Sequence, residues 1–168
     1  MGPEDVMDVK SLHVAAEQGD ASAQTDLGLL YYKGQDVPQD YTEAMRWFRK
    51  AADQEHARAQ WGLGHMYEQG NGVARDLSEA AKWYRKAAER GDTVAQWNLG
   101  AMYEWRDGVP RDYKLAHMWY NLASSTYPAS RAGEPNNAIR MRESIASKLA
   151  PEDLAEALRL ADAWKPTP

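Results

Sequence analysis

Cysteine is absent from the 168 residues of the chain. Disulfide bonds, thiolate nucleophiles and cysteine-ligated zinc are therefore excluded. Long runs of Val, Ile and Thr are missing as well, whereas alanine and other helix-forming residues are frequent. This composition favours helices over strands. The apolar share of 43% is sufficient for a folded core.

Long apolar runs and a strong excess of one charge are also lacking. No apolar stretch approaches the about 20 residues that a membrane-spanning helix needs. The formal net charge of −5 is mild and provides no basic field for nucleic acid. No basic segment followed by an apolar segment opens the chain, so we expect no signal peptide. We expect neither a membrane nor a nucleic acid as a partner, and the compartment stays open.

A repeat with a period of 36 residues is the strongest signal in the sequence. Residues 16–51 and 52–87 are identical at 17 of 36 positions, and residues 52–87 and 88–123 are again identical at 17 of 36, without a gap. Such self-similarity indicates a repeat architecture in which each unit packs on its neighbours. The recurring residues are Ala23, Gln24, Leu27, Gly28, Tyr31, Val37, Asp40, Ala44, Trp47 and Ala51; Ala59, Gln60, Leu63, Gly64, Tyr67, Val73, Asp76, Ala80, Trp83 and Ala87; and Ala95, Gln96, Leu99, Gly100, Tyr103, Val109, Asp112, Ala116, Trp119 and Ala123.

Each repeat is predicted to be a helix–turn–helix. Its packing residues recur every four positions in the first half and every three or four in the second, which is helical spacing. Asp40, Asp76 and Asp112 stand where a helix N-cap is favoured. Gly28 in mid-helix costs about 1 kcal/mol relative to alanine. Its recurrence suggests that the paired helix approaches closely there, with the recurring tryptophan filling the space between layers.

At these positions the chain resembles the Sel-one-like repeat family, the 36-residue relative of the tetratricopeptide repeats. The family pattern is A-x-A-Q-x-x-L-G-x-x-Y-x-x-G-x-G-V-x-x-D-x-x-x-A-x-x-W-Y-x-K-A-A, and the second repeat carries nearly all of it. The resemblance covers roughly residues 12–128. It implies an all-α fold, a right-handed superhelical solenoid of antiparallel helix pairs with N- and C-terminal capping helices. It also implies a bacterial protein of the cytoplasm or periplasm that acts as a scaffold or adaptor.

Two turn residues depart from the family pattern. Asp36 replaces a turn glycine in the first repeat, and Arg106 replaces the preceding glycine in the third. We expect the turn geometry to differ at both places, because such turns favour a residue without a side chain. Some secreted relatives with paired cysteines have been linked to penicillin binding, and the absence of cysteine makes that activity a poor match for this chain.

We expect a single solenoid domain over residues 1–168. Its expected segments are an N-terminal capping helix at 4–18, repeats at 22–57, 58–93 and 94–129, and C-terminal capping helices within 130–168. Amphipathic stripes and turn signals predict helices at 4–17, 21–33, 40–52, 57–69, 76–89, 93–105, 112–125, 136–149 and 151–164.

No constellation for catalysis or metal binding is evident. The histidines at positions 13, 56, 65 and 117 occupy unrelated repeat positions and form neither an H-x-x-x-H nor an H-E-x-x-H pair. Ser-x-x-Lys, the nucleophile motif that a penicillin-binding hydrolase would need, does not occur. We therefore predict a protein that is not an enzyme and that takes no cofactor and no metal. A basic run that recurs with the period is interpreted as a solvated helix face: Arg46, Arg49, Lys50, Lys82, Arg85 and Lys86.

The predicted partner surface follows from the family fold, in which the first helices line the concave side. Positions of these helices that are not used for packing differ most between repeats, and they carry aromatic residues typical of binding hot spots. The predicted binding residues are Leu29, Tyr32, Arg58, Trp61, His65, Glu68, Trp97, Glu104 and Trp105. The alternative is that the large residues pack between repeats, and Trp105 is the best candidate for exposure because its equivalents are Lys33 and Gln69.

The sequence therefore predicts a non-catalytic scaffold that binds a peptide or protein on its concave face. His65 would make that binding respond to mild acid. Two alternatives remain, a hydrolase of the penicillin-binding kind and a self-assembling structural repeat protein. Trp83 lies in the central repeat and is expected to be more deeply buried than Trp47 and Trp119, so that its replacement by alanine costs about 3–5 kcal/mol.

Overall fold

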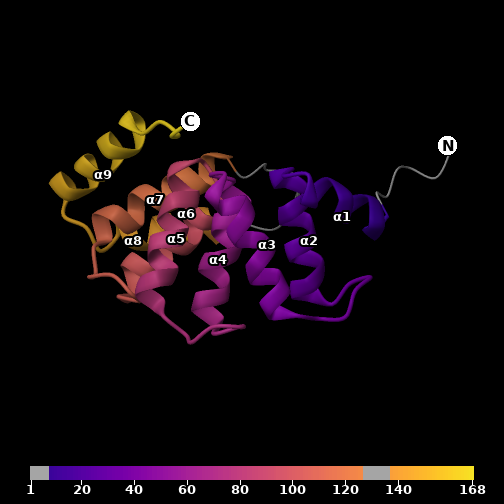
Figure 1. The fold of residues 1–168 in the computed structure, drawn as a ribbon. Coiled ribbons are helices and arrows are strands. Elements are labelled where there is room, and N and C mark those ends of the chain that lie inside the picture. Colours follow the sequence, from indigo (N-terminus) through magenta and orange to yellow (C-terminus); the bar gives the residue numbers. More distant parts are fainter. Residues whose placement is uncertain (1–7, 127–136) are drawn as a thin grey trace. The chain divides into compact units, whose positions relative to one another are not determined.

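The computed structural model describes residues 8–126 and 137–168, and within them the chain is helical and contains no strand (Figure 1). The chain divides into two compact units, residues 1–75 and 76–168, called unit one and unit two below. Unit one contains α1 (Val9–Glu17), α2 (Ala21–Lys33), α3 (Tyr41–Asp53) and α4 (Ala57–Gln69). Unit two contains α5 (Leu77–Glu89), α6 (Thr93–Trp105), α7 (Tyr113–Thr126), α8 (Asn137–Ala146) and α9 (Pro151–Ala163). The expectation of an all-α fold built from helix pairs is confirmed.

Two predicted helix boundaries need correction. The first helix is predicted to start at residue 4, but residues 4–7 lie outside the described part of the chain. The helix α1 begins at Val9, because Asp8 is extended and accepts a hydrogen bond from Ser11 N at 2.7 Å. The eighth helix was expected to reach residue 149, but α8 ends at Ala146. Ala150 is extended, as residues before a proline prefer, and the chain leaves the helix before Pro151 opens α9.

Aspartates cap the second helix of every repeat, as predicted. Asp40 accepts hydrogen bonds from the backbone N–H groups of Thr42 and Glu43. Asp76 and Asp112 each accept one from the residue three positions later. A side-chain acceptor at this position satisfies donors that have no partner within the helix. The N-caps therefore fix where each second helix begins.

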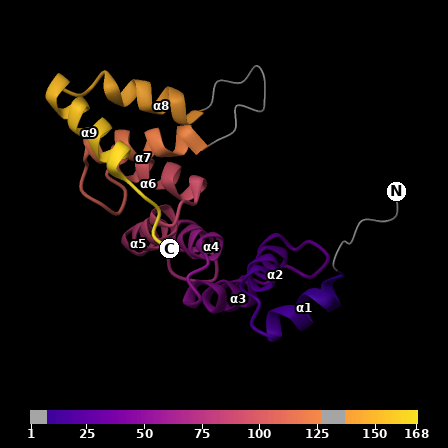
Figure 2. The same ribbon diagram turned by 90° about the horizontal axis from the view of Figure 1, so that it is seen from above.

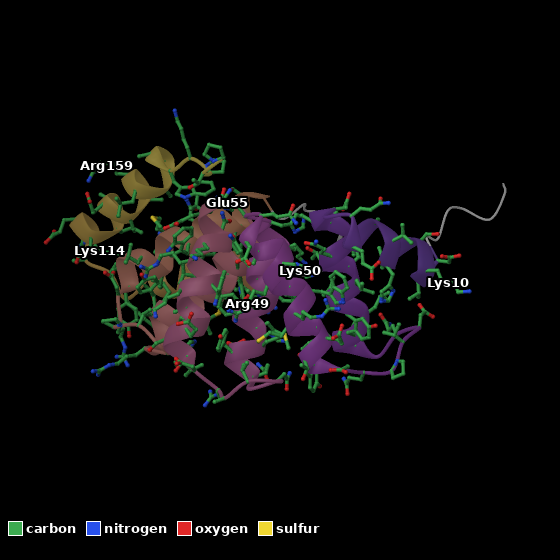
Figure 3. All side chains as sticks on the ribbon, viewed as in Figure 1. Lys10, Arg49, Lys50, Glu55, Lys114 and Arg159 are labelled. Atoms are coloured by element: carbon green, nitrogen blue, oxygen red, sulfur yellow. The ribbon has the colours of Figure 1, made fainter. Side chains whose placement is uncertain are left out.

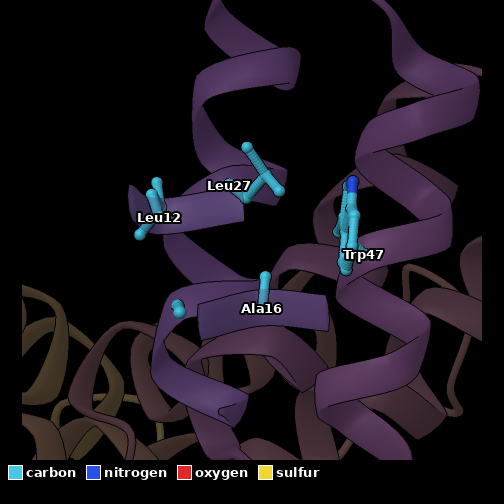
Figure 4. Packing of buried hydrophobic residues seen from close by; sticks show 5 residues of the cluster. Leu12, Ala16, Leu27 and Trp47 are labelled. Carbon is cyan, nitrogen blue, oxygen red and sulfur yellow. The ribbon is translucent and has the colours of Figure 1, made fainter. Parts of the chain in front are cut away.

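In unit one, the core lies between α1, α2 and α3. Leu12 and Ala16 of α1 meet Ala23 and Leu27 of α2, and Trp47 of α3 closes the cluster (Figure 4). Gln24 lies at its edge, where its Nε2 donates to Ala16 O at 2.9 Å. This carbonyl lies in the last turn of α1 and also accepts from Gly19 N at 3.2 Å, so the buried glutamine adds a side-chain donor to the end of the helix.

Mid-helix glycines make room for an aromatic ring of the partner helix. A Cβ built on Gly28 would lie 2.7 Å from Phe48 Cδ1, and one built on Gly100 in unit two would lie 2.9 Å from Tyr120 Cδ1. The ring of Phe48 also covers Gly62 of α4 at 3.0 Å. Close approach at the glycines was predicted, but the residue that fills the space is the aromatic one after the recurring tryptophan.

In unit two, α7 is the central helix and packs against α6, α8 and α9 (Figure 2). Trp119 of α7 meets Trp164 at the end of α9 edge to face, with ring centroids 6.4 Å apart. Tyr120, Ala123 and Ile145 are almost completely buried in this unit. The C-terminal helices therefore cover the last repeat, as their amphipathic sequences predict.

Asp36 and Arg106, the two turn residues that differ from the family pattern, do not change the turn geometry. Arg106 adopts φ 64°, close to the φ 66° of Gly34 and the φ 72° of Gly70 at the same helix end. Asp36 adopts φ 59°, where Gly72 has φ 72°. The expectation of different turns is therefore wrong. The fold imposes the left-handed conformation on residues with a side chain, at a cost of about 1–2 kcal/mol each.

The expected order of tryptophan burial is also wrong. Trp47 is 1% exposed and Trp119 is 5% exposed, whereas Trp83 is only half-buried. Trp47 and Trp119 are enclosed by several helices of their own unit. Trp83 belongs to α5, which is the first helix of unit two and packs within that unit against α6. Lys86 lies over its ring, with Nζ 4.5 Å from the centroid.

We predict that Trp47→Ala lowers the free energy of unfolding by about 3–5 kcal/mol, because a large aromatic side chain is removed from a closed core. Trp83→Ala should cost less than half of that amount, because its ring is already partly in water. Urea denaturation of both variants measures the difference. A larger loss for Trp83→Ala would contradict the burial described above.

Candidate functional site

A continuous series of aromatic rings lies on the first-helix side of unit one. Tyr41 at the start of α3 contacts Tyr32 of α2, with ring centroids 5.5 Å apart. Tyr32 contacts His65 of α4 at 5.5 Å, and His65 is stacked on Trp61 at 5.3 Å with an interplanar angle of 8°. The guanidinium of Arg58 lies over Trp61, with Cζ 4.3 Å from the ring centroid. We call these five residues the aromatic strip.

The strip is partly open to solvent and internally fixed. The four rings are half-buried, and Arg58 is exposed. Asn71 Nδ2 donates a hydrogen bond to Tyr32 Oη at 3.0 Å, and burial raises the pKa of the Tyr32 hydroxyl. Glu68 Oε2 lies 3.6 Å from His65 Nδ1. The rings are therefore held in place while part of each faces outward.

Helix geometry explains how α4 contributes three members. Arg58, Trp61 and His65 are spaced three and four residues apart, so they share one face of α4. Tyr32 reaches this face from the last turn of α2. The predicted residues Leu29 and Glu68 are half-buried. Tyr41 and Asn71 were missed, because nothing in the sequence indicates that the start of α3 and the turn after α4 meet at Tyr32.

The corresponding face of unit two carries two exposed tryptophans. Trp97 is 36% exposed and Trp105 is 61% exposed. They are eight residues apart on α6, which places them on one face about 12 Å apart. Ala101 lies between them and is half-buried. The tryptophans are therefore separated by a small residue rather than by another ring.

Cations lie near Trp105 and the neighbouring Tyr113. Lys148 Nζ, from the segment between α8 and α9, lies 6.0 Å from the Trp105 ring centroid and 5.4 Å from that of Tyr113. The guanidinium carbon of Arg111 lies 5.9 Å from the centroid of Tyr113. We call Trp105, Tyr113, Arg111 and Lys148 the basic aromatic patch.

Glu104 does not belong in the predicted set of binding residues. It was expected on the partner side, yet it is 3% exposed. Its Oε2 accepts a hydrogen bond from Tyr120 Oη at 3.0 Å, and its Oε1 lies 3.2 Å from Lys148 Nζ. The carboxylate is buried because α7 and the segment after α8 supply a hydroxyl and a cation for it. These partners are 16 and 44 residues away along the chain, so no local pattern indicates them.

The described residues contain no group of three or more His, Asp or Glu side chains that could hold a metal ion. His56 pairs with Thr25 Oγ1 at 2.8 Å, and His13 lies against Tyr31 and Trp47. His117 is buried, and its burial lowers the pKa of the imidazole. These histidines belong to separate packing environments. Within the described residues, no helix has the length and apolar character needed to cross a membrane.

The recurring basic residues of the second helices are exposed, as expected, and Figure 3 labels Arg49 and Lys50 among them. Arg49 donates to Tyr67 Oη at 3.3 Å, and Lys50 lies over Trp47 with Nζ 4.7 Å from the ring centroid. Arg46 pairs with Glu43 at 2.6 Å. These side chains cover aromatic residues and pair with acids of their own helix. Their recurrence is therefore accounted for by packing.

Three comparisons with known proteins agree on the fold. Residues 21–56, 57–92 and 93–125 match the Sel1 repeat. The secretory immunoglobulin A-binding protein EsiB of Escherichia coli O6:H1 (strain CFT073) is 42% identical over 45 residues, which are 27% of this chain and 9% of that protein.

Two crystal structures are similar to this chain. A protective antigen present in uropathogenic Escherichia coli strains, which displays an SLR fold, gives a TM-score of 0.81 at 36% identity and covers 92% of this chain and 32% of that one. A Sel1 repeat protein from Oxalobacter formigenes gives a TM-score of 0.70 at 38% identity and covers 82% of this chain and 98% of that one. The chain thus spans 9% and 32% of the two Escherichia coli proteins.

We predict that Lys148→Met lowers the free energy of unfolding by about 1–2 kcal/mol, because the buried Glu104 carboxylate loses its cation while Lys148 itself is partly exposed. Adding Glu104→Gln to this variant should recover most of the loss, since an amide needs no counter-charge. Urea denaturation of the single and double variants tests this coupling, with Arg159→Met on the surface of α9 as a control. Equal stability of Lys148→Met and the unchanged protein would contradict it.

Proposed function

Because this chain belongs to the Sel1 repeat family, whose members usually act as protein–protein interaction modules, we propose that it is a non-catalytic scaffold that holds a peptide or protein segment on the first-helix faces of its repeats. The proposed contact residues are those predicted from the sequence, without the buried Glu104. They are Leu29, Tyr32, Arg58, Trp61, His65 and Glu68 in unit one, and Trp97 and Trp105 in unit two.

The aromatic strip is the observation that supports this proposal most strongly. Its rings lie in contact from Tyr41 to Trp61 and remain half-buried. A ring held by its neighbours loses little conformational freedom when a partner covers it, so more of the contact free energy is kept for binding. Trp and Tyr provide a large contact area with few rotatable bonds. Such a surface suits an extended or helical segment of another protein.

The polar members of the surface would select among partners. Arg58 is exposed at one end of the strip, and Glu68 lies beside His65. An exposed guanidinium favours a partner carboxylate near Trp61. Charged groups at the rim of an interface govern specificity and association rate more than affinity. We propose that His65, stacked on Trp61, makes binding respond to mild acid.

The comparisons support a protein as the partner. The relative EsiB is described as an immunoglobulin A-binding protein. The matching segment covers a small part of that protein, so the identity of its ligand is not carried over to this chain. What is carried over is the class of ligand, a protein surface.

The proposal is tested with peptides selected from a displayed random library on the unchanged protein. We expect Trp61→Ala or Trp105→Ala to weaken the selected peptides at least about 30-fold, which corresponds to the hot-spot threshold of 2 kcal/mol. The melting temperature should stay nearly unchanged, because both side chains are partly or largely exposed. Fluorescence anisotropy of labelled peptides measures the dissociation constants.

Leu158→Ala is the matched control. Leu158 is an exposed apolar residue of α9 that lies outside both proposed faces. Its replacement should leave the dissociation constants unchanged. If Leu158→Ala weakened binding as much as the tryptophan variants did, or if neither tryptophan variant weakened it, the proposed faces would be wrong.

A further inference from the structure

The basic aromatic patch of unit two differs chemically from the aromatic strip of unit one. Trp105 takes the place that Gln69 has in the second repeat, and Arg111 takes the place of Arg75. Arg75 uses its Nε to donate to Glu68 O at 3.0 Å. Arg111 is exposed and lies over Tyr113. Gln39 has the place of Arg111 in the first repeat, and Gln69 has that of Trp105 in the second, so packing does not require a guanidinium or an exposed tryptophan at these positions.

Solvent-facing charge around Trp105 is mainly positive. Arg106, Arg111 and Lys148 are exposed in the two segments that border the ring. Asp107 is the exposed carboxylate of the same turn. Arg106 and Arg111 thus outnumber Asp107, while Lys148 is paired with the buried Glu104.

Three other acidic groups near the patch are already engaged. Asp112 is half-buried and accepts a hydrogen bond from Leu115 N at 3.0 Å as the cap of α7. Asp153 lies 3.4 Å from Lys114 Nζ. Glu104 is buried and pairs with Lys148, so that its charge offsets that of the ammonium. The surface around Trp105 therefore offers positive charge to a ligand.

Lys148 is held in a fixed place. Its contact with Glu104 at 3.2 Å holds the ammonium within 6.0 Å of the Trp105 centroid and 5.4 Å of the Tyr113 centroid, while 38% of the side chain stays exposed. An ammonium has three donors, and the glutamate oxygen uses one of them. A carboxylate from outside can therefore bind Lys148 without displacing Glu104.

We propose that the basic aromatic patch binds a segment of a partner protein in which an acidic side chain is next to an apolar or aromatic one. The apolar group packs on Trp105, and the carboxylate binds Lys148 and Arg111. This inference rests on the proposed function and adds the chemical class of the segment bound by unit two. Charge complementarity carries it, because an apolar ligand alone would not account for the cations around the ring.

Peptides from the displayed library are first sorted by their dependence on Trp105. Those whose binding is lost in Trp105→Ala should be enriched in Asp or Glu adjacent to Leu, Phe, Tyr or Trp. Arg111→Glu should weaken these peptides at least tenfold, with Arg111→Gln between it and the unchanged protein. Replacing the peptide's acidic residues by Lys should restore binding to Arg111→Glu. Raising the salt concentration should weaken the acidic peptides, because the pairs are near the surface.

Three outcomes would overturn this inference. Trp105-dependent peptides without an excess of acidic residues would show that the cations do not select the ligand. Peptides that depend on Trp61 and never on Trp105 would leave the proposed function in place and remove a binding role from the patch. A fluorescein-labelled oligo-dT strand that binds in a Trp105- and Arg111-dependent manner would assign the patch to single-stranded nucleic acid instead.

Discussion

The contact of an aromatic ring with a mid-helix glycine sets the geometry of the helix pairs. Phe48 lies on Gly28 and Gly62, and Tyr120 lies on Gly100, at distances that a Cβ atom would violate. A glycine in mid-helix gives up about 1 kcal/mol relative to alanine, so its presence must be offset by what the missing side chain allows. Here it allows a fully buried ring to lie directly on the backbone of the neighbouring helix. The spacing of the helices follows from this contact.

The same contact explains why other aromatic residues are left for the surface. With the interior of each pair filled by Phe48 or Tyr120, the first helices do not need Trp61, Trp97 or Trp105 for packing within the pair. Trp61 is half-buried, and Trp97 and Trp105 are exposed. In unit one the remaining aromatic residues stack on one another, and in unit two they are combined with cations. One scaffold can therefore present two different chemistries.

Much of the fold could be predicted from the sequence, because its determinants are local and recur. The N-caps at Asp40, Asp76 and Asp112 and the buried faces of the second helices follow from spacing alone. Of the surface set, Tyr32, Trp61 and His65 come together in one series of contacts, although their role in binding is a proposal.

What the sequence did not reveal depends on contacts between distant residues. Glu104 occupies a position that faces outward in a regular repeat, yet Lys148 and Tyr120 reach it from other elements and make its burial possible. Arg106 keeps a backbone conformation that favours glycine, because the turn is determined by the helices that it joins. Trp83 is less buried than its equivalents for a similar reason, since burial depends on which helices surround a position within its unit.

The change in unfolding free energy caused by Gly100→Ala tests the central contact most directly, because the two relevant effects have opposite signs. Helix propensity alone predicts a gain of about 1 kcal/mol for alanine in mid-helix. The contact with Tyr120 predicts a net loss of up to about 2 kcal/mol, since overpacking a closed core costs about 1–3 kcal/mol and the gain in helix propensity offsets about 1 kcal/mol of it. A loss measured by urea denaturation would agree with the ring-on-glycine contact. A gain of stability would contradict it.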